Sequence, residues 1–150
     1  MISDDLNELY QEVIVDHSSR PRNFGKMERA GRTVEGFNPL CGDKISLYLS
    51  MDQEVIQDIR FEGQGCAISK ASASMMTVAL KGRTRSEAQG LFQHFQQMVM
   101  TGEFQEEGVG NLAVFSGVHK FPARVKCAVL SWHAASSALQ EKPETVVSTE

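Results

Sequence analysis

The sequence predicts a single domain that mixes β-strands with α-helices, and two observations indicate this class. Residues 45–51 and 55–62 alternate apolar with polar side chains, which is typical of strands with one buried face. From residue 67 onward, apolar residues recur at steps of three and four, as in amphipathic helices. A length of 150 residues suits one compact core. We therefore expect one domain over residues 1–140 and a flexible tail over residues 141–150.

The first third of the chain predicts one helix and then a small sheet. Asp4 or Asp5 can begin a helix with an apolar stripe, and the polar cluster at residues 18–21, which ends in proline, should end it. Residues 22–31 are basic and rich in turn formers, so we expect an exposed connection, followed by a short strand at 34–37. The alternating segments 45–51 and 55–62 are joined by three polar residues, which suits a hairpin whose buried face includes Val55, Ile59 and Phe61.

The remaining elements are predicted helices. One spans about 67–81 and ends at Gly82, and a second opens with the capping-box pattern Thr84 to Glu87 and ends at Gly102. Residues 102–117 are acidic and contain glycine, so we expect a long excursion there with at most a short helix. A last helix begins near Pro122, a residue favoured in the first turn, and continues to about residue 139.

All three cysteines lie in short stretches at the ends of these elements. The stretches are residues 38–43 (NPLCGD), 63–67 (GQGCA) and 124–127 (RVKC). Cys41 lies in a turn sequence with a carboxylate, Asp43, two residues later. Cys66 lies between a glycine and a helix start, where free N–H groups stabilise a thiolate. Because the hairpin returns the chain to its starting edge, Asp43 and Cys66 should emerge at the same edge of the sheet.

We interpret these stretches as one metal site with Cys41, Asp43, Cys66 and Cys127 as ligands. Three thiolates and one carboxylate suit tetrahedral zinc, whereas calcium and magnesium prefer oxygen. Arg124 is expected near the ligands, where it would offset their negative charge. Each cysteine could instead be a small buried hydrophobe, an explanation that applies best to Cys127 beside its helical stripe. The four histidines lie elsewhere and are expected to be solvated or away from the site rather than ligands.

The charge, the apolar patterning and the number of cysteines exclude several classes of function. The net charge is −4, and no basic tract appears, so nucleic acid is not an expected partner. No stretch approaches the roughly 20 apolar residues of a membrane span, and the first residues lack the pattern of a secretory signal. We therefore expect a cytoplasmic protein. An odd number of cysteines in a reducing compartment favours metal binding or thiol chemistry over disulfides.

The three stretches, together with SGV at 116–118 and FPARVKCA at 121–128, resemble the iron-sulfur cluster assembly proteins of the IscU/SufU type, which belong to the NifU N-terminal-like family. The resemblance covers almost the whole chain. It implies an α+β fold, SufE/NifU-like, with a small, mainly antiparallel three-stranded sheet packed against a layer of helices. Lys126 stands where the IscU scaffolds carry a histidine, and the interval from Cys66 to Cys127 is longer than in those proteins. Both features resemble the SufU branch.

For SufU-like proteins the resemblance implies a zinc-dependent sulfurtransferase. Cys41 would accept persulfide sulfur from a pyridoxal-phosphate cysteine desulfurase of the SufS type, Asp43, Cys66 and Cys127 would hold zinc with it, and Arg124 would support the site. Downstream iron-sulfur assembly proteins would be further partners. Two alternatives stay open: a scaffold on which a [2Fe–2S] cluster is assembled and passed on, and a zinc-stabilised interaction module without sulfur transfer.

Overall fold

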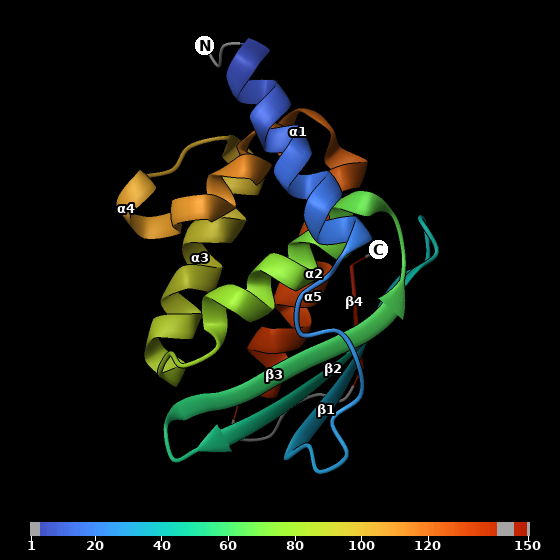
Figure 1. The fold of residues 1–150 in the computed structure, drawn as a ribbon, viewed down its shortest axis with the longest axis vertical. Coiled ribbons are helices and arrows are strands. Elements are labelled where there is room, and N and C mark those ends of the chain that lie inside the picture. The colour runs from blue at the N-terminus through green and yellow to red at the C-terminus, as the bar shows by residue number, and fades with distance from the viewer. Residues whose placement is uncertain (1–3, 141–145, 150) are drawn as a thin grey trace.

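The computed structural model describes residues 4–140 and 146–149 and places a four-stranded sheet against a layer of helices (Figure 1). The sheet order is β3-β2-β1-β4, formed by β1 (Arg32–Asn38), β2 (Asp43–Asp52), β3 (Val55–Gln64) and β4 (Val146–Ser148). The helices are α1 (Asp4–Ser19), α2 (Ala67–Leu80), α3 (Arg85–Thr101), α4 (Glu106–Val109), the 3₁₀ helix η1 (Gly110–Lys120) and α5 (Pro122–Ala138). This is the predicted α+β class.

The predicted hairpin is confirmed and fixes the edge at which the cysteine stretches emerge. β2 pairs antiparallel with both β1 and β3, and the pairs Asn38–Asp43 and Lys44–Gln64 lie at one end of the sheet. Ile45, Leu47 and Leu49 are buried, as the alternation predicts. The turn from β1 into β2 and the start of α2 therefore meet at this end (Figure 1).

The predicted phase of β3 is wrong at its first residue. The register shifts between Ser50 and Met51, so an irregularity interrupts the alternation near the hairpin turn. As a result Ile56 is fully buried, whereas Val55 is 38% exposed. Ile59 and Phe61 lie beyond the shift and are buried as expected.

A fourth strand joins the three that the sequence predicts. β4 pairs parallel with β1 through Glu35–Val146, Gly36–Val147 and Phe37–Ser148, within the range for which we expect a tail; residues 141–145 and 150 of that range lie outside the described residues. Thr149 continues the attachment: its N–H donates to the Phe37 carbonyl, and its hydroxyl donates to the Lys126 carbonyl. The alternation rule missed this strand because three residues are too few to show a period.

The helices form where their end signals predict. Thr84 and Glu87 make the reciprocal capping box of α3, and Gly102 ends that helix with a left-handed φ of 81°. Pro122 lies in the first turn of α5. Trp132 of α5 is fully buried and stacks on Phe95 of α3 at 4.4 Å between ring centroids. Among the described residues, no helix is both long and apolar enough to span a bilayer.

The expected excursion at residues 102–117 is wrong, because most of this segment is helical and packed. α4 and η1 occupy residues 106–120, and Leu112, Val114 and Phe115 are buried in the core. Phe115 lies edge-on to Phe95 at 5.8 Å. Burial of this apolar group stabilises helical turns that its acidic, glycine-bearing sequence does not predict.

The connection at residues 22–31 and His17 before it make more contacts with the rest of the chain than the sequence predicts. The backbone of Asn23 and Gly25 hydrogen-bonds with Phe61 on the outer edge of β3. His17 is not a solvated ring: its Nδ1 lies 2.7 Å from the Ser74 hydroxyl, and burial lowers the pKa of the imidazole. The connection therefore covers a sheet edge that would otherwise expose unpaired backbone groups.

Candidate metal centre

Cys41 lies in a tight turn between β1 and β2. Its N–H donates to the Asn38 carbonyl at 3.2 Å, and Gly42 follows with φ +71°, a left-handed conformation that glycine adopts without strain. Asp43 then begins β2 with its side chain 2% exposed. The turn therefore holds the Cys41 thiol at the surface while the carboxylate two residues later points inward.

Cys66 begins α2 and contacts Asp43. Its sulfur accepts a hydrogen bond from the Ser69 N–H at 3.4 Å, which makes Cys66 the N-cap of the helix. Its own N–H donates to Asp43 Oδ1 at 3.0 Å, and its sulfur lies 3.9 Å from Oδ2. One carboxylate thus fixes the start of α2 and faces the thiol at the same time.

Cys127 brings the third sulfur from α5. It is fully buried, and its sulfur lies 3.4 Å from the Cys41 sulfur, 3.5 Å from the Ala123 carbonyl and 3.7 Å from Asn38 Nδ2. Burial, helped by the neighbouring Asp43 and Cys41, raises the pKa of the Cys127 thiol. The surroundings of this sulfur in the metal-free protein therefore favour the thiol over the thiolate.

The structure brings all four predicted ligands to one end of the sheet, three of them most closely. Ligand atoms of Cys41, Asp43 and Cys127 lie within 4.8 Å of one another, and Cys66 is outside that closest group but contacts its carboxylate. Ligands around tetrahedral zinc are about 3.6–3.8 Å apart, given Zn–S of ~2.3 Å and Zn–O of ~2.0–2.2 Å. The observed 3.4 Å between Cys41 and Cys127 and 3.9 Å between Asp43 and Cys66 bracket this range. The donor set suits zinc, and these two pairs lie near the required spacing, whereas the Cys66 sulfur lies farther than 4.8 Å from at least one of the other two sulfurs and would have to approach them to share one ion.

Arg124 lies where the sequence predicts a compensating charge. Its side chain is exposed, and the charge of Cys66 together with a hydrogen bond to Cys127 raises the pKa of its guanidinium. The histidines do not join the group of ligand atoms in the described part of the chain. His133 instead lies edge-on to Phe92, and burial lowers the pKa of its imidazole.

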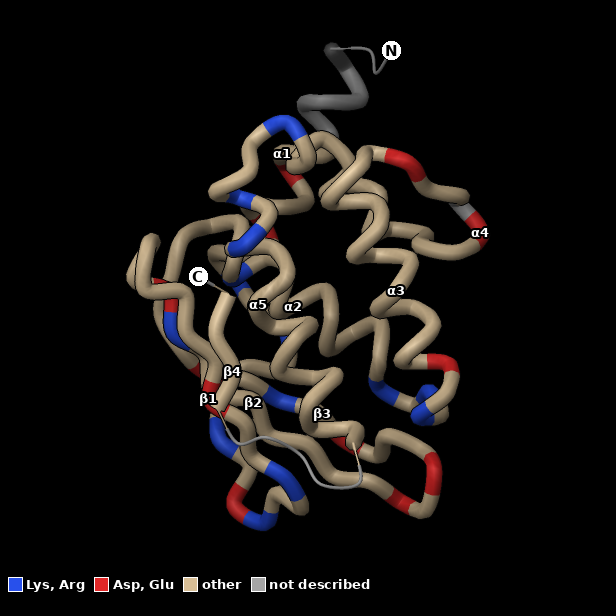
Figure 2. The backbone as a smooth tube through the Cα atoms, turned by 180° about the vertical axis from the view of Figure 1, so that it is seen from behind, with Lys and Arg blue, Asp and Glu red and all other residues tan. Residues whose placement is uncertain are grey.

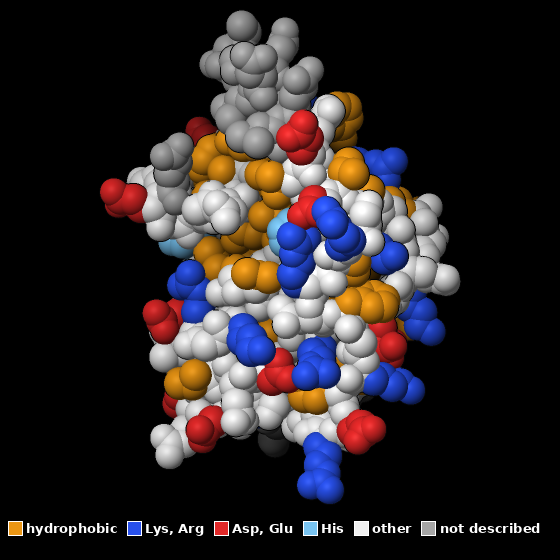
Figure 3. All heavy atoms as spheres, in the orientation of Figure 1, with side chains coloured by type: hydrophobic (Ala, Val, Ile, Leu, Met, Phe, Trp, Pro, Cys, Tyr) orange, Lys and Arg blue, Asp and Glu red, His pale blue; other side chains and the backbone are white. Residues whose placement is uncertain are grey.

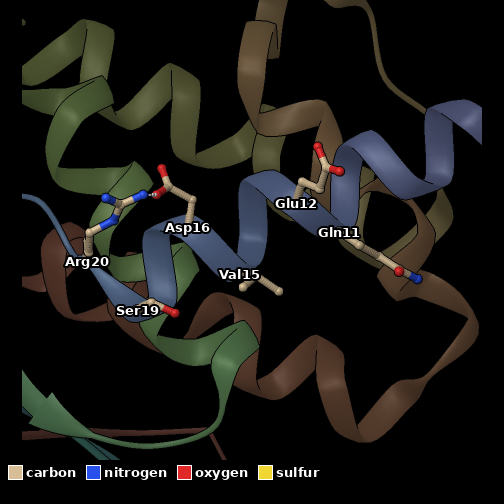
Figure 4. Close-up of a pocket in the computed structure, with 6 residues that line it drawn as sticks. All are labelled: Gln11, Glu12, Val15, Asp16, Ser19 and Arg20. Atoms are coloured by element: carbon tan, nitrogen blue, oxygen red, sulfur yellow. Dashed lines mark hydrogen bonds and ion pairs between the residues drawn. The ribbon is translucent and has the colours of Figure 1, made fainter.

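Two other hollows of the surface are lined by none of the predicted ligands. One of about 480 Å³ follows α1 and is lined by that helix alone, with Asp16 and Arg20 paired across its rim (Figure 4). Another of about 260 Å³ is lined by residues that include His17, Met75 and Leu112. Figure 3 shows apolar side chains gathered beside a histidine on the face of the molecule drawn there. Basic and acidic residues are interspersed along the coloured tube in Figure 2. None of the residues lining these two hollows is a cysteine.

Gly65 provides a direct test of how the chain packs around the Asp43 carboxylate. A Cβ at this position would lie 2.7 Å from Asp43 Oδ1 and 3.1 Å from its Cγ, so Gly65→Ala should displace the carboxylate. We expect zinc affinity to fall by about 10–100-fold, as is usual when groups supporting a metal ligand are changed, measured by chelator competition. Gly90→Ala is the control, because a Cβ added at this position of α3 would meet no atom within 4 Å. Equal zinc affinity of the two variants would show that zinc binding does not depend on the position of the Asp43 carboxylate.

Comparison with known proteins places this arrangement in a family. Residues 9–128 match the family model described as the NifU-like N terminal domain. The chain is 41% identical over 138 residues to the zinc-dependent sulfurtransferase SufU of Bacillus subtilis, covering 91% of this chain and 93% of that one. It is 43% identical over 136 residues to the iron-sulfur cluster assembly scaffold protein IscU of Streptococcus pyogenes, covering 90% and 85%.

Solved structures show the same relationship. A crystal structure from Fervidobacterium islandicum, described as an iron-sulfur cluster assembly scaffold protein for the SUF system, superposes with a TM-score of 0.83 at 38% identity, over 89% of this chain and 98% of that one. The N-terminal NifU-like protein of Brucella abortus shares the fold, with a TM-score of 0.82 at 21% identity over 91% and 96%. With the family match spanning residues 9–128, this chain belongs to the NifU-like N-terminal domain family.

Proposed function

We propose that this protein is a zinc-dependent sulfurtransferase of iron-sulfur cluster assembly, which accepts sulfur on Cys41 from a pyridoxal-phosphate cysteine desulfurase of the SufS type. One observation carries the proposal: the exposed Cys41 sulfur lies 3.4 Å from the buried Cys127 sulfur, at the edge of a group of potential metal ligands. A ligand that is also open to solvent is suited to react with a partner protein.

The four proposed ligands differ in exposure, and this difference suggests different roles for them. Cys41, Asp43, Cys66 and Cys127 would hold zinc, which when bound keeps its cysteine ligands as thiolates. Asp43 and Cys127 are buried and Cys66 is tied to the start of α2, so these three would retain the metal. Arg124 would offset the negative charge of the ligand set.

The transfer itself needs an exposed thiolate and a partner persulfide. The Cys41 thiolate attacks the terminal sulfur of the desulfurase persulfide, forming a new S–S bond on Cys41. The S–S bond on the desulfurase breaks, and the electron pair leaves with its cysteine thiolate. No external oxidant or reductant is consumed. The persulfide on Cys41 is then available to downstream iron-sulfur assembly proteins in the cytoplasm.

A second candidate is a scaffold that assembles a [2Fe–2S] cluster, and it is favoured by relatives bearing that name, including the Thermotoga maritima IscU at 37% identity over 133 residues. Thiolates ligate iron-sulfur clusters as readily as zinc. In this chain Lys126 precedes the third cysteine, so that position offers no imidazole ligand of the kind an iron-sulfur cluster can use.

Metal content separates the two functions. We expect the aerobically purified protein to be colourless and to contain about one zinc per chain by elemental analysis, because the four proposed ligands would complete one tetrahedral site. A brown protein with iron and acid-labile sulfide would instead support the scaffold. Stimulation of a SufS-type desulfurase by the zinc-loaded protein, measured as sulfide or alanine production, tests the transfer directly.

A further inference from the structure

A fifth polar side chain borders the candidate metal centre, and the sequence alone gives it no role. Asn38 is the last residue of β1 and is 0% exposed. Its Nδ2 lies 3.7 Å from the Cys127 sulfur, to which it donates. Its Oδ1 is buried, and no donor reaches it from the described part of the chain.

The unpaired Oδ1 argues against a role for Asn38 in fold stability alone. A buried acceptor without a partner destabilises a fold, because it has lost its hydrogen bonds to water. An apolar residue of similar shape would avoid this loss at the same position. Fold stability alone therefore does not account for an amide here, whereas its N–H group has a defined target in the sulfur.

The three sulfurs differ in the donors that reach them. Cys66 accepts from the Ser69 N–H, Cys127 accepts from Asn38 Nδ2, and Arg124 hydrogen-bonds to both of these sulfurs. Within the described ranges, the only hydrogen-bonding partner of the Cys41 sulfur is the Cys127 sulfur itself. An N–H donor stabilises negative charge on a thiolate and makes it a poorer nucleophile, so the two supported sulfurs are restrained and Cys41 is not.

We propose that Asn38 is a positioning residue that keeps Cys127 as the resident ligand and thereby leaves Cys41 as the sulfur that reacts. This inference rests on the proposed function, since it assumes that the four ligands hold zinc. Arg124 is exposed whereas Asn38 is buried, so the inference assigns to the Asn38 hydrogen bond the shielded part of the difference between two thiols whose sulfurs are in contact.

The test uses Asn38→Leu, which keeps the number and branching of the side-chain heavy atoms and removes both polar atoms. We expect the metal-free variant to fold and to unfold at the same temperature as the parent or higher, because the unpaired acceptor is gone. We expect zinc affinity, measured by competition with a chromophoric chelator, to fall by about 10–100-fold. Ser131→Ala is the control: it removes a hydroxyl on α5 that is buried and has no partner among the described residues, and it should leave zinc affinity unchanged.

A second readout follows the individual cysteines. In the zinc-loaded parent, alkylation at fixed pH followed by peptide mass spectrometry should label Cys41 before Cys127. In Asn38→Leu the ratio of Cys127 to Cys41 labelling should rise at least severalfold.

If the variant fails to fold, Asn38→Ala is measured in the same two ways. The proposal would be overturned if a folded variant bound zinc as tightly as the parent and its cysteines were labelled in the same order. This outcome would count against Asn38 even if sulfur transfer by the parent is demonstrated. Loss of metal-free stability with unchanged affinity would assign Asn38 to the fold alone.

Discussion

Replacing Cys41 with alanine should abolish stimulation of a cysteine desulfurase, lowering it at least ~100-fold, because no other exposed thiol is available to accept the sulfur. Cys66 is partly exposed but caps α2, and Cys127 is buried. The measurement is sulfide or alanine production by a SufS-type enzyme with each variant, together with mass spectrometry of the transferred sulfur.

The control for Cys41 must show that the variant is intact. Cys41→Ser and Cys41→Ala should keep the circular dichroism of the parent, because the exposed side chain contributes little to the core. Val15→Ala, at an exposed position of α1, should stimulate like the parent. Full stimulation by a folded Cys41→Ala variant would remove Cys41 from the acceptor role and the proposed transfer with it.

Replacing Asp43 should have the largest effect on metal binding. Asp43→Ala removes a proposed ligand and also the acceptor for the Cys66 N–H, so we expect zinc affinity to fall by more than ~100-fold, since changes to supporting groups alone cost about 10–100-fold. The lost hydrogen bond should also lower the free energy of unfolding of the metal-free protein by about 1.5–3 kcal/mol, the range for bonds to charged groups. Chelator competition and denaturant unfolding measure the two effects.

Asp43→Asn separates these two roles. An amide oxygen can still accept from Cys66, so metal-free stability should stay near that of the parent while zinc affinity falls. Asp52→Ala, which removes an exposed carboxylate at the opposite end of β2, is the matched control and should change neither quantity. Unchanged zinc affinity in Asp43→Asn would mean that the fourth ligand is another group.

The sequence predicts the convergence of the cysteine stretches because local rules decide it. A hairpin returns the chain to its starting edge, and Cys66 follows that hairpin at a helix start, so Asp43 and Cys66 had to meet. Cys127 is different: its stretch comes from another part of the chain, and periodicity places it on a helix without saying which end of the sheet that helix faces. Cys127 was joined to the others because three thiolates and one carboxylate make a zinc donor set, and the resemblance implied the same ligands; its position in the chain did not predict it.

The parts that local rules missed depend on distant contacts. Residues 106–120 have the composition of an excursion, yet they are helical because Phe115 packs against Phe95. β4 forms because β1 offers a free edge, which no pattern within three residues can reveal. The role proposed for Asn38 depends on a sulfur 89 positions away, so its place in the NPLCGD motif is the only local signal.

The contact between the sulfurs of Cys41 and Cys127 also bears on how the protein tolerates air. Atoms 3.4 Å apart need to approach by only about 1.4 Å to reach the bond length of a cystine. With dioxygen or peroxide as the electron acceptor, two thiols so placed would cross-link residues 41 and 127 and leave neither sulfur free. A metal held as proposed would occupy both sulfurs and prevent this reaction, so loss of the ion would lead to oxidative inactivation that a reductant such as dithiothreitol reverses.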